Sequence, residues 1–225
     1  IRIAKSLGKR IHILHVTTRE EIAYLAAHKD VASVEVTPQH LTLAAPEAYE
    51  RLKGYAQMNP PIRGPEHREG LWVGVANGVA DVIGSDHAPH TAEEKARPYP
   101  ASPSGMPGVQ TLLPVMLTHV AEGRLTLERL VDLTSHGANR IFGLADKGRL
   151  AVGYDADLTV VDLKARRTFR HEDMASRVGW TPFVGMEAKG WPIATIIRGT
   201  VVMRDDEIVA PSLGQPVRFQ ETLAA

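Results

Sequence analysis

Short apolar runs alternate with amphipathic stretches along roughly the first 145 residues of the chain. Three of the runs are too short for helices and rich in β-branched residues, which predicts strands over 10–16, 31–36 and 82–84. Apolar residues at helical spacing predict helices within the longer stretches, which are 18–29, 37–54, 64–80, 109–123 and 126–143. Thr18, with Glu21 three residues later, has the spacing of a capping box at the start of the first helix. Repeated strand–helix units predict a parallel sheet, either open or closed into a barrel.

The pattern changes near residue 146, where glycine turns and β-branched residues replace the helical spacing. The stretches 148–163 and 193–209 predict antiparallel strands, with a hairpin around Asp205–Asp206. We therefore predict a first domain over residues 1–145 and a small β domain over residues 146–225.

Composition indicates a globular chain and excludes several classes of partner. Of the 225 residues, 44% are hydrophobic, and 26 basic side chains balance 26 acidic ones. A net charge of zero gives no long-range attraction to nucleic acid or to an anionic membrane. No apolar stretch reaches the roughly 18 to 20 residues of a membrane span. We expect a small-molecule substrate and a cytoplasmic location, with no nucleic-acid or membrane partner.

Polar side chains stand where each of the three predicted strands ends. His15 lies near the end of the first strand, Glu35 and His40 lie around the end of the second, and Asp86 and His90 follow the third. Each position has an ordinary structural alternative, namely a hydrogen-bonded core histidine, a surface cap, or an aspartate that begins a loop. Together they are more informative, because each follows an apolar strand in the same strand–helix series.

A barrel would bring these strand ends together at one mouth, where barrel enzymes keep their chemistry. The chain has no cysteine, so a metal there would be held by histidine and carboxylate, a ligand set suited to zinc. Alternation along the first strand puts His12 and His15 on opposite faces, so we expect that they do not serve the same site. His15 and Asp86 remain as candidate ligands, and these two are too few to hold a catalytic metal firmly.

Six segments carry a resemblance to a known family. They are HILHV (12–16), EVTPQHL (35–41), MNPPIR (58–63), SDHAPHTAEEK (85–95), SGMPGVQTLLP (104–114) and KGRLAVGYDADLTVVDL (147–163). In this order they are similar to the later part of the dihydroorotases, a family of the amidohydrolase superfamily. SDHAPHTAEEK is the most specific segment, because hydantoinases and allantoinases usually lack its second histidine in this form. PQHL stands between the PHHL of dihydroorotases and the PQYL of hydantoinases.

The resemblance implies roles for the residues at matching positions. His15 would bind the more exposed of two zinc ions, and Asp86 would bind the buried ion and act as the general acid and base. Asn59, His90 and the backbone of Gly105 would contact the substrate, with His90 facing the substrate's carboxylate.

The resemblance also implies what lies around these residues. His40 and Glu35 match positions that bind an extra zinc in some relatives, or that stand behind the metal ligands. Those relatives have a cysteine where this chain has Leu14, so we expect no third metal. A His-x-His pair, a carboxylated lysine bridging the two zinc ions, another histidine and a substrate-binding arginine would lie upstream of Ile1. HILHV would then be the sixth barrel strand, and we expect the chain to be a fragment.

The implied fold is the last three strands of a TIM-type (β/α)8 metal-dependent hydrolase barrel, with part of a composite β-sandwich domain. The implied activity is the zinc-dependent, reversible hydrolysis of dihydroorotate to N-carbamoyl-aspartate in pyrimidine biosynthesis. Two alternatives stay open. One is another cyclic-amide hydrolase, a hydantoinase (dihydropyrimidinase) or an allantoinase. The other is an inactive dihydroorotase-like subunit that scaffolds aspartate transcarbamoylase. The expected protein partner is accordingly either a second copy of the chain, in a homodimer, or aspartate transcarbamoylase.

Overall fold

The computed structural model describes residues 1–220 and divides the chain into two compact units. The first unit joins 1–112 to 168–187, and the second joins 113–167 to the chain from Ala188 onward. The domain boundary predicted after residue 145 stays a prediction. None of the helices within residues 1–220 combines the length and the apolar character needed to cross a membrane.

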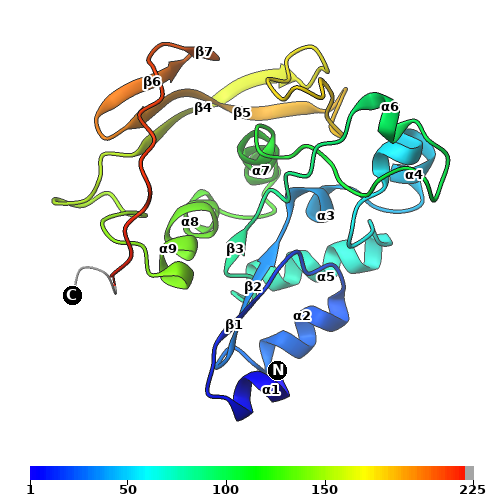
Figure 1. Ribbon diagram of the computed structural model, residues 1–225, viewed down its shortest axis with the longest axis horizontal. Coiled ribbons are helices and arrows are strands. Elements are labelled where there is room, and N and C mark those ends of the chain that lie inside the picture. The colour runs from blue at the N-terminus through cyan, green and yellow to red at the C-terminus, as the bar shows by residue number, and fades with distance from the viewer. Residues whose placement is uncertain (221–225) are drawn as a thin grey trace. The chain divides into compact units, whose positions relative to one another are not determined.

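A three-stranded parallel sheet organises the first unit (Figure 1). Its strands are β1 (Ile11–Ile13), β2 (Ala32–Val36) and β3 (Val82–Ile83), in the order β1-β2-β3. β2 pairs in parallel with both neighbours, so that Ile11 lies beside Ala32 and Glu35 lies beside Val82. Four of the five residues of β2 are buried, as expected for the middle strand of a covered parallel sheet. The parallel sheet predicted from the strand–helix repeat is therefore confirmed, with strands shorter than the apolar runs.

Short helices precede, connect and follow these strands. They are α1 (Arg2–Ser6), α2 (Arg19–Ala26), α3 (Pro38–Thr42), α4 (Glu47–Leu52), a 3₁₀ turn (Lys53–Ala56), α5 (Pro65–Ala76) and α6 (Ala92–Lys95). The helices predicted over 18–29 and 64–80 are confirmed as α2 and α5, and each ends earlier than predicted. The capping box is also confirmed, because Thr18 accepts the backbone N–H of Glu21 while the Glu21 carboxylate accepts the N–H of Thr18.

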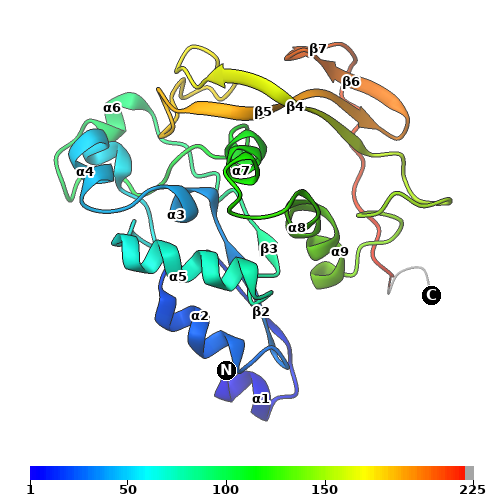
Figure 2. The same cartoon turned by 180° about the vertical axis from the view of Figure 1, so that it is seen from behind.

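Helices α2 and α5 lie side by side and approach closely through two glycines of α5 (Figure 2). A Cβ atom added to Gly70 would lie 2.1 Å from the Cβ of Arg19, and one added to Gly74 would lie 2.8 Å from the Cδ1 of Ile22. Glycine costs a helix roughly 0.5–1 kcal/mol relative to alanine. The two glycines in α5 are therefore explained by the close approach of α2 rather than by helix propensity.

A buried histidine ties the segment after β2 to a later loop. His40 is 3% exposed; its Nδ1 lies 2.7 Å from the hydroxyl of Thr37, and its Nε2–H donates to the carbonyl of Pro60 at 2.9 Å. Burial lowers the pKa of His40 to about 4, because a charged ring would lose its hydration there. The ring is therefore neutral near pH 7, and it fixes the position of the Pro60 backbone.

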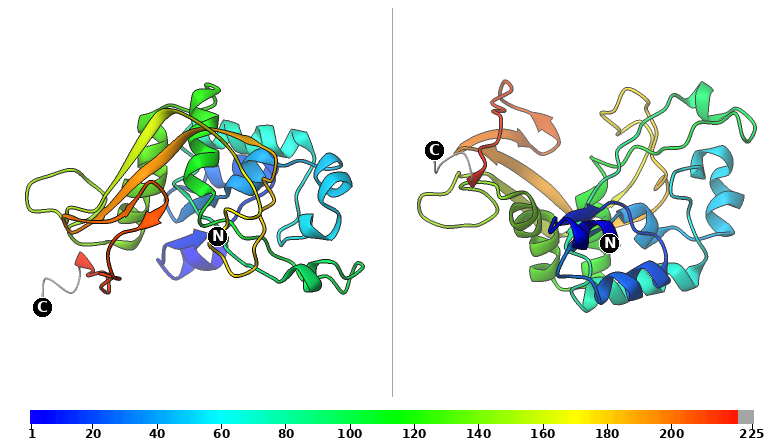
Figure 3. Two further views of the ribbon diagram at one scale, coloured as in Figure 1. Left: turned by 90° about the horizontal axis from the view of Figure 1, so that it is seen from above. Right: turned by 60° about the horizontal axis from the view of Figure 1, so that its bottom comes forward.

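The second unit combines three helices with an antiparallel sheet. Its elements are α7 (Leu112–Ala121), α8 (Leu127–Val131), a π-helical turn (Asp132–His136), α9 (Gly137–Phe142), β4 (Leu158–Thr168), β5 (Glu187–Ile197), β6 (Thr200–Arg204) and β7 (Glu207–Ile208). The sheet has the order β4-β5-β6-β7, and helices α7 to α9 lie along one of its faces (Figure 3). The antiparallel strands predicted over 193–209 and the turn at Asp205–Asp206 are confirmed, and a further turn joins β5 to β6 at Arg198–Gly199. The strand predicted over 148–163 is wrong for its first part, because β4 begins only at Leu158.

Replacing Gly70 with alanine should destabilise the protein, although alanine is the better helix former. The added methyl group would overlap the Cα and Cβ of Arg19, and overpacking costs about 1–3 kcal/mol, more than the helix propensity gained. We expect a lower midpoint of urea unfolding with an unchanged m-value. Gly214→Ala is the control, because the nearest atom to its added Cβ is 3.9 Å away. A Gly70→Ala midpoint as high as that of the wild type would contradict this account of the helix contact.

The stability of the protein should fall as the pH is lowered from 7 to 5, in part because of His40. The pKa of His40 is about 4 in the folded state and near 6.5 in the unfolded state, so the unfolded state binds the proton more readily. Stabilisation present above pH 6.5 is therefore lost as the pH falls toward 4, by about 2 kcal/mol between pH 7 and 5. His40→Gln keeps a donor for Pro60 and does not titrate, so its urea midpoint should fall less over this range. Parallel curves for the variant and the wild type would remove His40 as the cause.

Candidate active site

The carboxyl ends of β1 and β3 lie at the same edge of the parallel sheet, and the two predicted metal ligands follow them. His15 comes two residues after β1, and Asp86 comes three residues after β3. Both have positive φ angles, 34° for His15 and 43° for Asp86, which residues other than glycine seldom adopt. Strained backbone of this kind concentrates at functional sites. His15 and Asp86 are two of seven such residues among residues 1–220, and they are the two that follow strands of the parallel sheet. Their role as metal ligands stays a prediction.

Glu35 lies between these positions, near the end of β2. Its Oε1 accepts the backbone N–H of His15 at 3.2 Å, and a Cβ atom added to Gly84 would lie 2.4 Å from its Oε2. The same Oε2 is 3.8 Å from the Nε2 of His12, whose Nδ1 is 2.8 Å from the hydroxyl of Ser33. Glu35 thus holds the backbone of His15 beside the end of β3. Its predicted place behind the metal ligands is compatible with these contacts and stays a prediction.

The strand predicted over 10–16 is wrong for its last residues, because β1 ends at Ile13. The positive φ of His15 breaks the extended backbone on which strict alternation depends. The argument that separated His12 from His15 therefore does not apply. Glu35 in fact contacts both residues, through the ring of His12 and through the backbone of His15.

The turn that carries Asp86 is fixed on both sides. Gln39 is fully buried, and its Nε2 donates to the carbonyl of Ser85 at 2.9 Å. His87 accepts the N–H of Gly108 at its Nδ1 at 3.1 Å, which leaves the ring proton on Nε2. These bonds hold the main chain immediately before and after Asp86, so its carboxylate extends from a backbone of defined position.

The structure brings together two of the predicted substrate-binding residues, His90 and Gly105. The Nε2–H of His90 donates to the carbonyl of Ser104 at 3.0 Å, and the backbone carbonyl of His90 accepts the indole N–H of Trp180 at 2.9 Å. Gly105 has a φ angle of 141°, and a Cβ atom added to it would lie 2.4 Å from the carbonyl oxygen of Ala88. Only glycine allows this approach, so the loop at 104–105 lies directly against the turn that carries Asp86 and His90.

Asn59, the third predicted substrate residue, is exposed on a loop that is tied to the same region. His40 binds the carbonyl of the next residue, Pro60, and the carbonyl of Gln57 accepts the N–H of Gly105 at 3.0 Å. Asn59 therefore lies between two anchored carbonyls. The structure connects the loops that carry Asn59, His90 and Gly105, and their contact with a substrate stays a prediction.

The donors present fit a zinc site in kind but not in number. The imidazole of His15 and the carboxylate of Asp86 are groups that bind zinc. Both ring nitrogens of His40 already have protein partners. Among residues 1–220, no three histidine, aspartate or glutamate side chains form a group that could hold a metal ion. Catalytic zinc takes about three protein ligands, so a zinc site at this edge would need further ligands from outside these residues.

Sequence reasoning missed two buried side chains that support the site. Gln39 stands beside His40 within PQHL, and a polar residue just after a buried strand is a signal that would have identified it. Trp180 lies 90 positions from His90 along the chain, so no local pattern connects the two.

Known proteins resemble this chain in sequence and in structure. The dihydroorotase of Methanosarcina acetivorans is 39% identical over 227 residues, which cover 96% of this chain and 48% of that protein. The dihydroorotase of Halobacterium salinarum is 40% identical over 210 residues, which cover 93% of this chain and 49% of that protein. Among solved structures, the L-hydantoinase (dihydropyrimidinase) of Arthrobacter aurescens matches with a TM-score of 0.89 at 34% identity, over 93% of this chain and 48% of that one.

These comparisons establish the family and the α/β fold. The chain spans about half the length of the curated relatives it matches. The model of the amidohydrolase family matches residues 1–202, a range that contains every predicted site residue. The chain belongs to the amidohydrolase family.

Proposed function

We propose that the protein is a cytoplasmic, zinc-dependent dihydroorotase, which interconverts dihydroorotate and N-carbamoyl-aspartate in pyrimidine biosynthesis. The observation that carries the proposal is the short segment from Asp86 to His90, in which Ala88 and His90 lie against the Gly105 loop and Asp86 follows strand β3. The relatives named dihydroorotase support the same activity. We further propose that residues 1–145 form the last three strand–helix units of a TIM-type (β/α)8 barrel, and that residues 146–225 form part of a composite β-sandwich.

Asp86 is the residue that we assign to proton transfer. Its carboxylate takes a proton from the attacking water and returns one to the amide nitrogen as the ring C–N bond breaks, so one water is added across that bond. The bonds of Gln39 and His87 hold the main chain on either side of Asp86, which reduces the entropy lost on reaching the reactive geometry. His15 and Asp86 would contribute to holding two zinc ions, bridged by a carboxylated lysine from outside this chain. When bound, these ions supply a lower pKa for the water and polarisation of the ring carbonyl.

Asn59, His90 and Gly105 are the residues that we assign to substrate binding. Dihydroorotate carries a carboxylate on its ring, and an imidazole can donate a charge-assisted hydrogen bond to it. The Nδ1 of His90 lies 3.8 Å from the carboxylate of Glu94, on the helical turn that follows it. The contact between the Gly105 loop and the turn at Ala88 brings backbone groups to the same place. Together these groups would fix the orientation of the ring before attack.

A different cyclic-amide substrate is the alternative within catalysis, because the solved structures that this chain resembles include a hydantoinase and a dihydropyrimidinase. The two readings differ in the charge of the substrate. Dihydroorotate is an anion with a ring carboxylate, whereas hydantoin and allantoin carry none. The role of His90 therefore separates a dihydroorotase from a hydantoinase or an allantoinase.

An inactive subunit that scaffolds aspartate transcarbamoylase is the alternative outside catalysis. Such a subunit needs no metal ligands, so the presence of both His15 and Asp86 argues against it. The complete coding sequence decides between the two, because a His-x-His pair and a lysine upstream support the enzyme and their absence supports the scaffold. Size-exclusion chromatography with and without aspartate transcarbamoylase distinguishes a homodimer from a mixed complex.

Asp86→Asn, in the protein expressed from its complete coding sequence, should abolish most dihydroorotate turnover. An amide neither accepts the proton of the water nor balances the charge of a metal, and loss of a general base costs about 10² to 10⁴ in rate. Asparagine tolerates the φ angle of 43° as well as aspartate does, so the fold is retained. Turnover is measured by steady-state kinetics and zinc by elemental analysis, which should show weaker retention of metal. Asp173→Asn, at an exposed carboxylate, is the control. Activity of Asp86→Asn within about threefold of the wild type would remove Asp86 from this role.

His90→Ala should raise the KM for dihydroorotate and leave the zinc content unchanged. A charge-assisted hydrogen bond to a carboxylate is worth roughly 1.5–3 kcal/mol, or about one to two powers of ten in kcat/KM. Turnover of hydantoin or allantoin, where detectable, should be nearly unaffected, because neither carries the ring carboxylate. His90→Gln keeps an N–H for the Ser104 carbonyl and so controls for movement of that loop. Loss of metal, or an equal loss with neutral and acidic substrates, would mean that His90 does not bind the carboxylate.

A further inference from the structure

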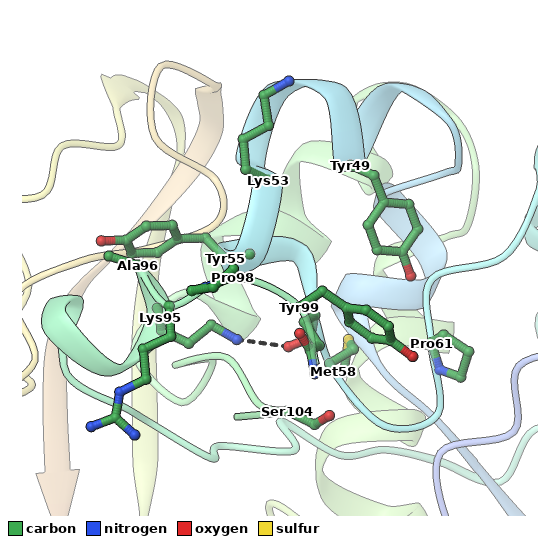
Figure 4. A pocket seen from close by; sticks show the side chains of 13 residues that line it. Tyr49, Lys53, Tyr55, Met58, Pro61, Lys95, Ala96, Pro98, Tyr99 and Ser104 are labelled. Atoms are coloured by element: carbon green, nitrogen blue, oxygen red, sulfur yellow. Dashed lines mark hydrogen bonds between the residues drawn. The ribbon is translucent and has the colours of Figure 1, made fainter. Parts of the chain in front are cut away.

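Lys95 is a buried lysine for which the proposed chemistry has no use. It is the last residue of α6 and of the segment SDHAPHTAEEK, and it is 1% exposed. Its ammonium group lies in the wall of a cavity of about 800 Å³, which is also lined by Tyr55, Tyr99 and Lys53 (Figure 4). Burial of an ammonium group is unfavourable unless polar partners replace its hydration. The partners of Lys95 therefore indicate what the residue does.

Those partners are backbone carbonyls rather than carboxylates. The Nζ of Lys95 donates to the carbonyls of Gln57 and Pro103, both at 2.8 Å, and lies 6.0 Å from the centre of the Trp180 ring. Within residues 1–220, Lys95 forms no ion pair with a carboxylate. Burial without a counter-charge lowers the pKa of Lys95 to about 8. A lysine in this setting contributes through the two carbonyls that it joins.

The two carbonyls belong to the loops that carry the predicted substrate residues. Gln57 precedes Asn59 by two positions, and Pro103 precedes Gly105 by two positions. The Gln57 carbonyl also accepts the N–H of Gly105 at 3.0 Å, so the Lys95 ammonium and the Gly105 amide share one acceptor. One side chain thus links the two loops, at the carbonyl that already joins them.

The direction of Lys95 is set by the helix on which it stands. Thr91 accepts the N–H of Glu94, and the Glu94 carboxylate accepts the N–H of Thr91 at 2.9 Å, which forms a capping box. This box begins α6 immediately after His90. The ammonium that joins the two loops is therefore attached, through one capped helical turn, to the residue assigned to the substrate carboxylate.

We propose that Lys95 is a positioning residue, which clamps the Asn59 loop to the Gly105 loop and so fixes the substrate-binding groups relative to His90. The inference rests on the proposed function for its effect on substrate, while the clamp itself rests only on the contacts above. A lysine that merely stabilised the fold would lower the unfolding midpoint and leave the KM unchanged.

The test compares Lys95→Met with Lys53→Met in the protein expressed from its complete coding sequence. Methionine keeps the length and the apolar part of the Lys95 side chain and removes its ammonium group. Lys53 lines the same cavity but is exposed, and its side chain extends away from Lys95 in Figure 4, so it is the matched control. Hydrogen–deuterium exchange is followed in peptides covering 57–61 and 103–106, alongside zinc content and the kcat and KM for dihydroorotate. Lys95→Gln is used if the methionine variant does not fold.

Lys95→Met should accelerate exchange in both peptides and raise the KM, each by about tenfold, because hydrogen bonds from a charged donor are lost from both loops. Zinc content and kcat should stay within about threefold of the wild type, and Lys53→Met should match the wild type throughout. Unchanged exchange in either peptide would overturn the clamp. Faster exchange with an unchanged KM would overturn the role in substrate positioning. A wild type that does not hydrolyse dihydroorotate would refute the proposed function instead, and the exchange measurement would still decide whether Lys95 joins the loops.

Discussion

The parallel pairing of β1 and β3 with the central strand β2 is the constraint on which the candidate site depends. Parallel strands end at the same edge, so His15 and Asp86 lie at one edge of the sheet, on either side of β2, although 70 residues of chain separate them. The carboxylate of Glu35 in β2 fills the space between the two strand ends and bonds to the backbone of His15. His15 and Asp86 both have positive φ angles, and the surrounding sheet with its hydrogen bonds maintains this backbone strain.

Beyond this edge, the loops are held by side chains that bind backbone carbonyls. Loops lack the regular hydrogen bonds of helices and strands, so their polar backbone groups need other partners wherever they are buried. Here a small set of polar side chains supplies these partners and at the same time fixes the loop positions. The side chains are Gln39, His40, His90 and Lys95, and the carbonyls belong to Ser85, Pro60, Ser104, Gln57 and Pro103. None of these bonds depends on a counter-charge, which suits a site that must keep its own charged groups for a substrate.

The sequence predicted the features that depend on local periodicity or on a short motif. The parallel sheet, the capping box at Thr18 and the antiparallel strands over 193–209 were of this kind, and each is confirmed. The end of β1 was not predictable from hydrophobicity, because Leu14 and Val16 continue the apolar run while the backbone at His15 turns away. The contact of Trp180 with His90 was hidden for a different reason, since it joins segments far apart in the chain and follows no repeat.

The single helical turn from Thr91 to Lys95 has a consequence for how the segment varies among homologous chains. One residue more or fewer in this turn would rotate Lys95 by about 100° around the helix axis and shift it by about 1.5 Å, away from both carbonyls. Substitutions on the exposed side of the turn, at Ala92 and Glu93, leave that geometry intact. In homologous chains we therefore expect no insertion or deletion between His90 and Lys95, even where the exposed residues between them are substituted. The spacing between these two residues is then a better guide to distant homologues than the identities of the residues between them.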